Sequence, residues 1–297
     1  MAKTFGENLL GNLNTDSNND RPRVVLLTYP SLVGAQVINR VSAEAGINLV
    51  GIGLSNRVFK GASHLQAVAT MHKRTGLRFT SYALGMTDLA WLLIRLQRAP
   101  RAFSDSSISL HTVRDINCNN TFKWLQDLQP DYVASCYFNQ IIGRRVIDIG
   151  KLGCINLHAA LLPALRGPEP CFRALERNQM ETGLTVHLVD EEIDTGPILH
   201  QEQRQIVPGL SLSELEVRLW TDGAKVLGRW MAANTSRATA LCIQALESPD
   251  YNTWPNPEEV KTFRRTGYSL SKPINDVRAI FDAAAGREPE YLPHRTQ

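Results

Sequence analysis

The chain has 297 residues, of which 43% are hydrophobic and 21% are charged, so it can bury a substantial core and is not a disordered protein. Its formal net charge of +3 is too small to indicate a surface dedicated to nucleic acid. No apolar run approaches the ~20 residues of a membrane helix, and the polar start lacks the apolar segment of a secretory signal. We therefore expect a cytoplasmic protein.

The five cysteines argue against a disulfide framework and against a structural zinc site. Their number is odd, and none forms a Cys-x-x-Cys motif or a Cys/His pair at ligand spacing. We expect buried thiols and no metal. The cysteines are Cys118, Cys136, Cys154, Cys171 and Cys242.

The first half of the chain alternates between strand-like and helix-like patterns. Residues 1–21, rich in Gly, Asn, Asp and Ser, predict a flexible N-terminal arm. The continuous apolar run over 23–29 is typical of a strand that is covered on both faces. Apolar spacing then predicts helices over 32–45, 64–75 and 86–98, and strands over 47–54 and 77–82.

The second half continues this alternation and then changes. It predicts helices over 121–128, 212–234 and 257–265, and strands over 131–136, 154–158, 183–189 and 198–206. Glu214 and Glu216 lie in the first turn of the long helix, where they suit the positive end of its dipole. The pattern indicates an α/β protein with a Rossmann-like, doubly wound, mostly parallel sheet. We expect a catalytic domain over 22–235 and a small C-terminal subregion over 236–297.

Reactive groups of such a sheet lie at the carboxyl ends of its strands. The predicted strand 154–158 ends with Asn156 and His158, which point to the same face because residues two apart in a strand do so. About forty residues later, Asp194 supplies a carboxylate on a Gly-Pro turn. The sequence therefore offers an amide, an imidazole and a carboxylate for one site.

Two motifs resemble the signature of the folate-dependent formyltransferase family. The first is Asn156-Leu-His158 with Leu161-Leu-Pro163 and Arg166-Gly167, and the second is Asp194-x-Gly196-Pro-Ile198. The resemblance covers roughly residues 22–230 and implies a formyltransferase fold. It also implies an enzyme of one-carbon metabolism, a transferase that takes its formyl group from N10-formyltetrahydrofolate as co-substrate.

The resemblance further assigns roles to residues. Asn156 and His158 would stabilise a tetrahedral oxyanion, and Asp194 would orient His158 and relay protons. The family's pterin-binding segment corresponds to Phe138, Asn139, Gln140, Ile141 and Ile142, and the turn that carries Asp190 and Glu191 would face the other side of the pterin. Without the two motifs the catalytic interpretation of His158 would be weaker, because a single histidine in a strand is more often a core residue.

The expected acceptor is a primary amine of a small metabolite, with a nucleotide-linked amino sugar as the leading class. No glycine follows the first strand until Gly34, which argues against phosphate binding by a glycine-rich loop and so against glycinamide ribonucleotide. Formylation of methionyl-tRNA and a catalytically silent binding protein are the alternatives. We expect no membrane partner and disfavour nucleic acid, with tRNA and a homodimer left open.

Several neighbouring residues have plainer interpretations. His187, within a predicted strand, is interpreted as structural. Asp190, Glu191 and Glu192 are interpreted as a solvated turn that faces the pterin, because no histidine lies at the spacing of a metal ligand. Trp220 is interpreted as a packing residue.

Overall fold

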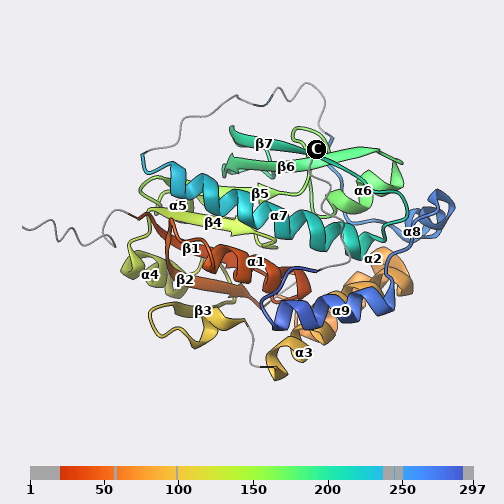
Figure 1. Cartoon of the computed structure of the whole chain (residues 1–297), viewed down its shortest axis with the longest axis horizontal. Coiled ribbons are helices and arrows are strands. Elements are labelled where there is room, and N and C mark those ends of the chain that lie inside the picture. The colour runs from red at the N-terminus through yellow and green to blue at the C-terminus, as the bar shows by residue number, and fades with distance from the viewer. Residues whose placement is uncertain (1–20, 57–58, 98–99, 237–243, 245–249, 290–297) are drawn as a thin grey trace, which may run out of the picture.

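The computed structural model describes residues 21–56, 59–97, 100–236, 244 and 250–289 (Figure 1). Residues 1–20 of the expected N-terminal arm, and Cys242, lie outside these ranges. The other four cysteines are free thiols. Within the described ranges, no helix is both long and apolar enough to cross a membrane.

The centre of the fold is a seven-stranded sheet in the order β3-β2-β1-β4-β5-β6-β7. The five strands from β3 to β5 in this order are parallel, and the last two pair antiparallel. The strands are β1 (Arg23–Thr28), β2 (Asn48–Ser55), β3 (Ser109–Val113), β4 (Tyr132–Cys136), β5 (Gly153–His158), β6 (Glu181–Leu188) and β7 (Ile198–Gln205). The strand order reverses between β1 and β4. The carboxyl ends of these two strands therefore form the switch point at which open α/β sheets bind ligands.

Both faces of the sheet are covered, as the continuous apolar strand patterns predicted. Val24 and Leu26 of β1 face a core that includes residues of α1 (Leu32–Ser42) and α7 (Leu212–Ala233), and these helices lie side by side across one face (Figure 1). Val25 and Leu27 face a smaller core with residues of α4 (Asn119–Leu128) and α5 (Arg144–Ile147). The doubly wound, mostly parallel fold is confirmed.

The strand predicted over 77–82 is wrong, because this segment belongs to the helix α2 (His64–Leu84). Gly76, with φ of 79°, kinks the helix without ending it. Phe79 is buried while Leu77 is 69% exposed, so the alternation that imitates a strand reflects a single aromatic anchor on a helix face. The predicted helix over 86–98 is present as a π-helical turn (Gly85–Leu89) followed by α3 (Ala90–Leu96).

Four helices and strands of the described ranges were not predicted: the edge strand β3, the short helices α5 and α6 (Pro170–Glu176), and α9 (Pro273–Ala284). The predicted helix over 257–265 is present as α8 (Pro257–Phe263) and a 3-10 turn (Arg264–Thr266), and another 3-10 turn spans Arg101–Ser104. Helix α9 packs against α1 and α3, and α8 packs against α2. The described C-terminal residues thus pack on the first helices of the chain.

Candidate functional site

A cavity of about 500 Å³ opens at the switch point of the sheet. The residue after β1, Tyr29, and the residue after β4, Tyr137, both line it, and so do Asn156 and His158 of β5. Asp194 reaches the same cavity from the turn between β6 and β7. The structure therefore brings together all three residues predicted to be catalytic.

His158 is 4% exposed and faces an acceptor at each ring nitrogen. Its Nε2 lies 2.9 Å from the carbonyl oxygen of Leu165, and its Nδ1 lies 3.6 Å from Oδ2 of Asp194. Since a carbonyl only accepts, Nε2 carries a proton and donates it to Leu165. In the neutral ring Nδ1 is then a free base, and when protonated it faces a carboxylate.

The position of Asp194 is set by an unusual backbone conformation and by hydrogen bonds from the loop after β5. Its φ of 56° is left-handed, an uncommon conformation for a residue with a side chain. The Gly167 N–H donates to Oδ2 of Asp194 at 2.9 Å, and Arg166 Nε donates to the neighbouring Ile193 carbonyl at 3.1 Å. The Arg-Gly part of the first motif thus fixes the carboxylate of the second motif.

Asn156 lies opposite His187 in the antiparallel pair of β5 and β6. The Asn156 Nδ2 lies 3.0 Å from Nε2 of His187, whose Nδ1 lies 2.8 Å from the Leu188 carbonyl. Nδ1 therefore donates to Leu188, and Nε2 accepts from the Asn156 amide. Burial, the largest influence, lowers the pKa of His187 and favours this neutral form.

His187 is thus a site residue that the sequence interpretation treated only as structural. It lines the cavity, and its Nε2 is 3.8 Å from Oδ1 of Asp194. It lies beside Asn156 because of the register between β5 and β6, for which the sequence holds no local signal.

The segment predicted to bind the pterin, Phe138–Ile142, lines the cavity. The side chain of Gln140 anchors this segment, because it donates to Ser55 Oγ and to the Val113 carbonyl at 2.8 and 3.0 Å. It also accepts from the Ile116 N–H at 2.9 Å.

Across the cavity, the turn after β6 contributes Asp190, Glu192 and Ile193, whereas Glu191 is exposed and not among the lining residues. Asp190 accepts a hydrogen bond from the Thr195 hydroxyl at 2.7 Å, which holds the turn closed. Two segments distant in sequence therefore line the same cavity as Asn156.

Two glutamates form a second polar group in the cavity that sequence analysis missed. Glu216 was predicted to serve the dipole of α7, but only Glu214 caps that helix, by bonding the Ser211 N–H at 2.7 Å. Glu216 instead lines the cavity and is hydrogen-bonded to Glu169. Its position follows from the packing of α7 over the sheet, which no local pattern reveals.

No group of His, Cys, Asp and Glu residues in the described ranges could hold a metal ion. The cavity instead presents an amide, an imidazole and a carboxylate, and in addition a pair of carboxyl groups. This donor set suits general acid–base chemistry and stabilisation of an oxyanion.

Comparison with known proteins agrees with this chemistry. A family model described as "Formyl transferase" matches residues 97–230, the part of the chain that carries Asn156, His158 and Asp194. A methionyl-tRNA formyltransferase from Kosmotoga olearia is 36% identical over 114 residues, which are 38% of this chain. The chain covers 37% of that relative's length, and so the match concerns one part of each protein.

Solved structures of similar proteins include a phosphoribosylglycinamide formyltransferase from Bacillus halodurans. It is 19% identical with a TM-score of 0.48, and the alignment covers 75% of this chain and all of that one. A sugar N-formyltransferase from a Shewanella species is 16% identical with a TM-score of 0.48, with 78% and 77% covered. The similarity to the formyl transferase family therefore concerns residues 97–230, the part of the chain that carries the three predicted catalytic residues.

Proposed function

We propose that the protein transfers a formyl group from N10-formyltetrahydrofolate to a primary amine. The observation that carries this proposal is the convergence of Asn156, His158 and Asp194 on one cavity within the formyl transferase domain. The acceptor nitrogen attacks the formyl carbon, the carbonyl oxygen becomes an oxyanion, and the bond from carbon to N10 of the folate then breaks. The amine loses one proton and N10 gains one, so the reaction needs no oxidant or reductant.

Each residue of the trio has a distinct part in the proposed reaction. The second amide N–H of Asn156 and the Nδ1–H of a protonated His158 donate hydrogen bonds to the oxyanion, while the Nε2–H of His158 stays bound to the Leu165 carbonyl. One such donor contributes about 3–4 kcal/mol to transition-state stabilisation. Asp194 stabilises the imidazolium, since its Oδ2 lies 3.6 Å from Nδ1 of His158, and the pair passes the proton from amine to N10.

The donor folate is proposed to lie between Phe138–Ile142 and the turn after β6. This placement is supported by the two segments lining the same cavity as the trio. The anchored side chain of Gln140 leaves the backbone and the apolar side chains of Phe138, Ile141 and Ile142 to contact the pterin ring. Asp190 supplies a carboxylate to the opposite face.

The acceptor is proposed to be an amine on a small metabolite, and the sequence motifs alone favour a nucleotide-linked amino sugar. Formylation of methionyl-tRNA is the second candidate, since methionyl-tRNA formyltransferases are 33–37% identical over parts of the chain. We place the reaction in the cytoplasm, where the buried thiols of Cys136, Cys154 and Cys171 stay reduced.

The test is tetrahydrofolate release when the purified protein meets the donor and a panel of amines, with formylated amine identified by mass. Amine-dependent release supports transfer. Release with the donor and water alone contradicts it and shows a hydrolase. If the protein neither releases tetrahydrofolate nor binds the donor, it is a catalytically silent protein that kept the fold.

A further inference from the structure

The carboxyl pair of Glu169 and Glu216 lines the wall of the cavity, where Glu216 is buried and Glu169 is half-buried. Glu216 is 5% exposed, and the Tyr82 hydroxyl donates to its Oε2 at 2.8 Å. Glu169 follows Gly167 by two residues, and the Gly167 N–H holds Asp194. The pair therefore belongs to the same cavity as the trio and lies close to it along the chain.

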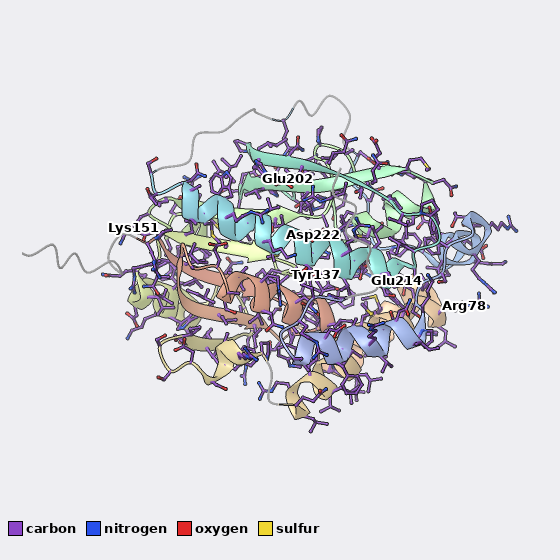
Figure 2. All side chains as sticks on the ribbon, in the orientation of Figure 1. Arg78, Tyr137, Lys151, Glu202, Glu214 and Asp222 are labelled. Atoms are coloured by element: carbon purple, nitrogen blue, oxygen red, sulfur yellow. The ribbon has the colours of Figure 1, made fainter. Side chains whose placement is uncertain are left out.

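Aromatic side chains surround this end of the cavity. Tyr29, Tyr82, Tyr137, Trp220 and Trp254 all line it. The ring of Tyr137 packs edge-on against Trp220 of α7, with centroids 5.2 Å apart. Figure 2 labels Tyr137 beside α7. Aromatic faces next to carboxylates are the combination that binds organic cations, through charge and cation–π attraction.

Tyr137 adds an observation independent of the two glutamates. It lies directly after β4 with a left-handed φ of 55°, which is uncommon for an aromatic residue. Its hydroxyl has no protein hydrogen-bond partner among the residues that the structure describes, although the side chain lines the cavity. A bound ligand with a polar group at this position would satisfy it.

Of the lysine and arginine residues that the structure describes, Arg74 alone is among those that line the cavity, and its guanidinium lies over the ring of Phe59, 4.9 Å from the centroid. Arg173 is the cation that acts on Glu169, but its Nη1 is bound to Glu176 at 2.7 Å and to Glu259 at 3.1 Å. Asp276 adds further negative charge next to Glu216. Burial accordingly raises the pKa of both glutamates, so that the pair holds a proton when no ligand is present.

We propose that Glu169 and Glu216, framed by Tyr82, Tyr137 and Trp220, bind a second cationic group of the acceptor, so that the substrate is an amine that carries another ammonium or guanidinium. This inference rests on the proposed formyl transfer and names its acceptor class. The reacting amine faces the trio, while the other cation replaces the proton of the carboxyl pair. The same negative charge disfavours the phosphates of a nucleotide-linked sugar or of tRNA.

The test compares α,ω-diaminoalkanes, putrescine and cadaverine among them, with ω-amino alcohols of the same length, using the full chain and N10-formyltetrahydrofolate. We expect kcat/KM to be at least about tenfold higher for the diamines, because a buried ion pair between the second ammonium and the glutamates strengthens binding by at least that factor. The preference should fall to about twofold or less in Glu216→Gln and Glu169→Gln. Glu258→Gln, an exposed glutamate on α8, is the matched control and should keep it.

A second readout does not require turnover. Calorimetric titration of a diamine in buffers of different ionisation enthalpy should show release of about one proton, since the bound cation ionises the carboxyl pair. Glu216→Gln and Glu169→Gln should each lose this proton release. If one variant fails to fold, the other still provides the test.

The outcomes separate the two proposals. Equal use of diamines and amino alcohols, or diamine binding without proton release, overturns the cationic acceptor while formyl transfer stands. Proton release with amino alcohols as well also overturns it, because the pair would then bind the reacting amine. Proton-linked diamine binding with no tetrahydrofolate release from any amine supports the cation site and overturns formyl transfer.

Discussion

Oδ2 of Asp194 lies 3.6 Å from Nδ1 of His158 and also accepts a 2.9 Å hydrogen bond from the Gly167 N–H. One oxygen therefore couples the imidazole at the end of β5, the loop that follows it and the turn after β6. The ring cannot rotate freely, since its Nε2 is bound to the Leu165 carbonyl. Proton transfer through His158 thus depends on the position of a single carboxylate.

Asp194→Asn is expected to lower turnover by about a hundredfold or more, because it keeps the shape of the turn but removes the charge that stabilises the imidazolium. The amide oxygen can still accept from Gly167, so the fold should be unchanged. The measurement is the pH dependence of kcat/KM. A variant with wild-type turnover and pH profile would show that this carboxylate is not coupled to His158.

Asn156→Ala and His158→Ala should each reduce turnover by about a hundredfold or more, since each removes a donor to the oxyanion. Thermal unfolding should confirm that both variants remain folded. Near-normal turnover of either purified variant would exclude that residue from the catalytic role.

His187 is expected to act through Asn156, as a positioning residue. His187→Leu removes the acceptor of the Asn156 amide and should lower kcat by about tenfold with little change in the KM for the donor. His187→Gln offers an amide oxygen in place of Nε2 and should recover part of kcat. An equal loss in both variants, or a change confined to KM, would argue against this positioning role.

The carboxyl pair makes the stability of the ligand-free protein fall as pH rises. Burial raises the pKa of Glu216 from 4.5 to about 7, so between these values the native state holds more protons than the unfolded chain. The free energy of unfolding then decreases with pH across this window. His187, whose pKa is lowered by burial, gives the opposite slope below its ordinary value of 6.5, so the comparison with a variant is needed.

Glu216→Gln should therefore weaken the decreasing contribution, of which Glu169 retains a part, while leaving that of His187. Urea unfolding of both proteins at several pH values checks this. Parallel pH curves for wild type and variant would contradict it.

Position 167 requires glycine because of both its backbone conformation and the atoms around it. Its φ is 109°, and a Cβ would come within 2.0 Å of the Asn252 carbonyl oxygen. Gly167→Ala should cost about 2–4 kcal/mol of stability and also displace Asp194. Gly209→Ala is the control, since its φ is 83° with open space around the Cβ, and it should cost about 1 kcal/mol with activity retained. Equal effects of the two would show that the contact with Asn252 is unimportant.

Local sequence patterns predicted those features of the fold that depend only on the secondary structure of the residue's own segment. Asn156 and His158 were found because strand geometry alone puts them on one face. Leu77–Tyr82 imitated a strand because the burial of Phe79 on a helix depends on packing against Phe172 and Trp254. The edge strand β3 was missed because its outer positions, Leu110 among them, are exposed.

The site residues that were missed share a different cause. His187 reaches Asn156 through the register of two strands, and Glu216 meets Glu169 only because α7 packs across the sheet. Both relationships join residues tens of positions apart. A single sequence holds no local signal for them.

The central claim is that this cavity transfers a formyl group to an amine by way of Asn156, His158 and Asp194. The most direct measurement incubates the full chain with isotope-labelled N10-formyltetrahydrofolate and a diamine, and follows the label by mass spectrometry. We predict label on the diamine in equal amount to the tetrahydrofolate released, and a loss of both in His158→Ala. Label recovered only as formate, or transfer that persists in His158→Ala, would contradict the account.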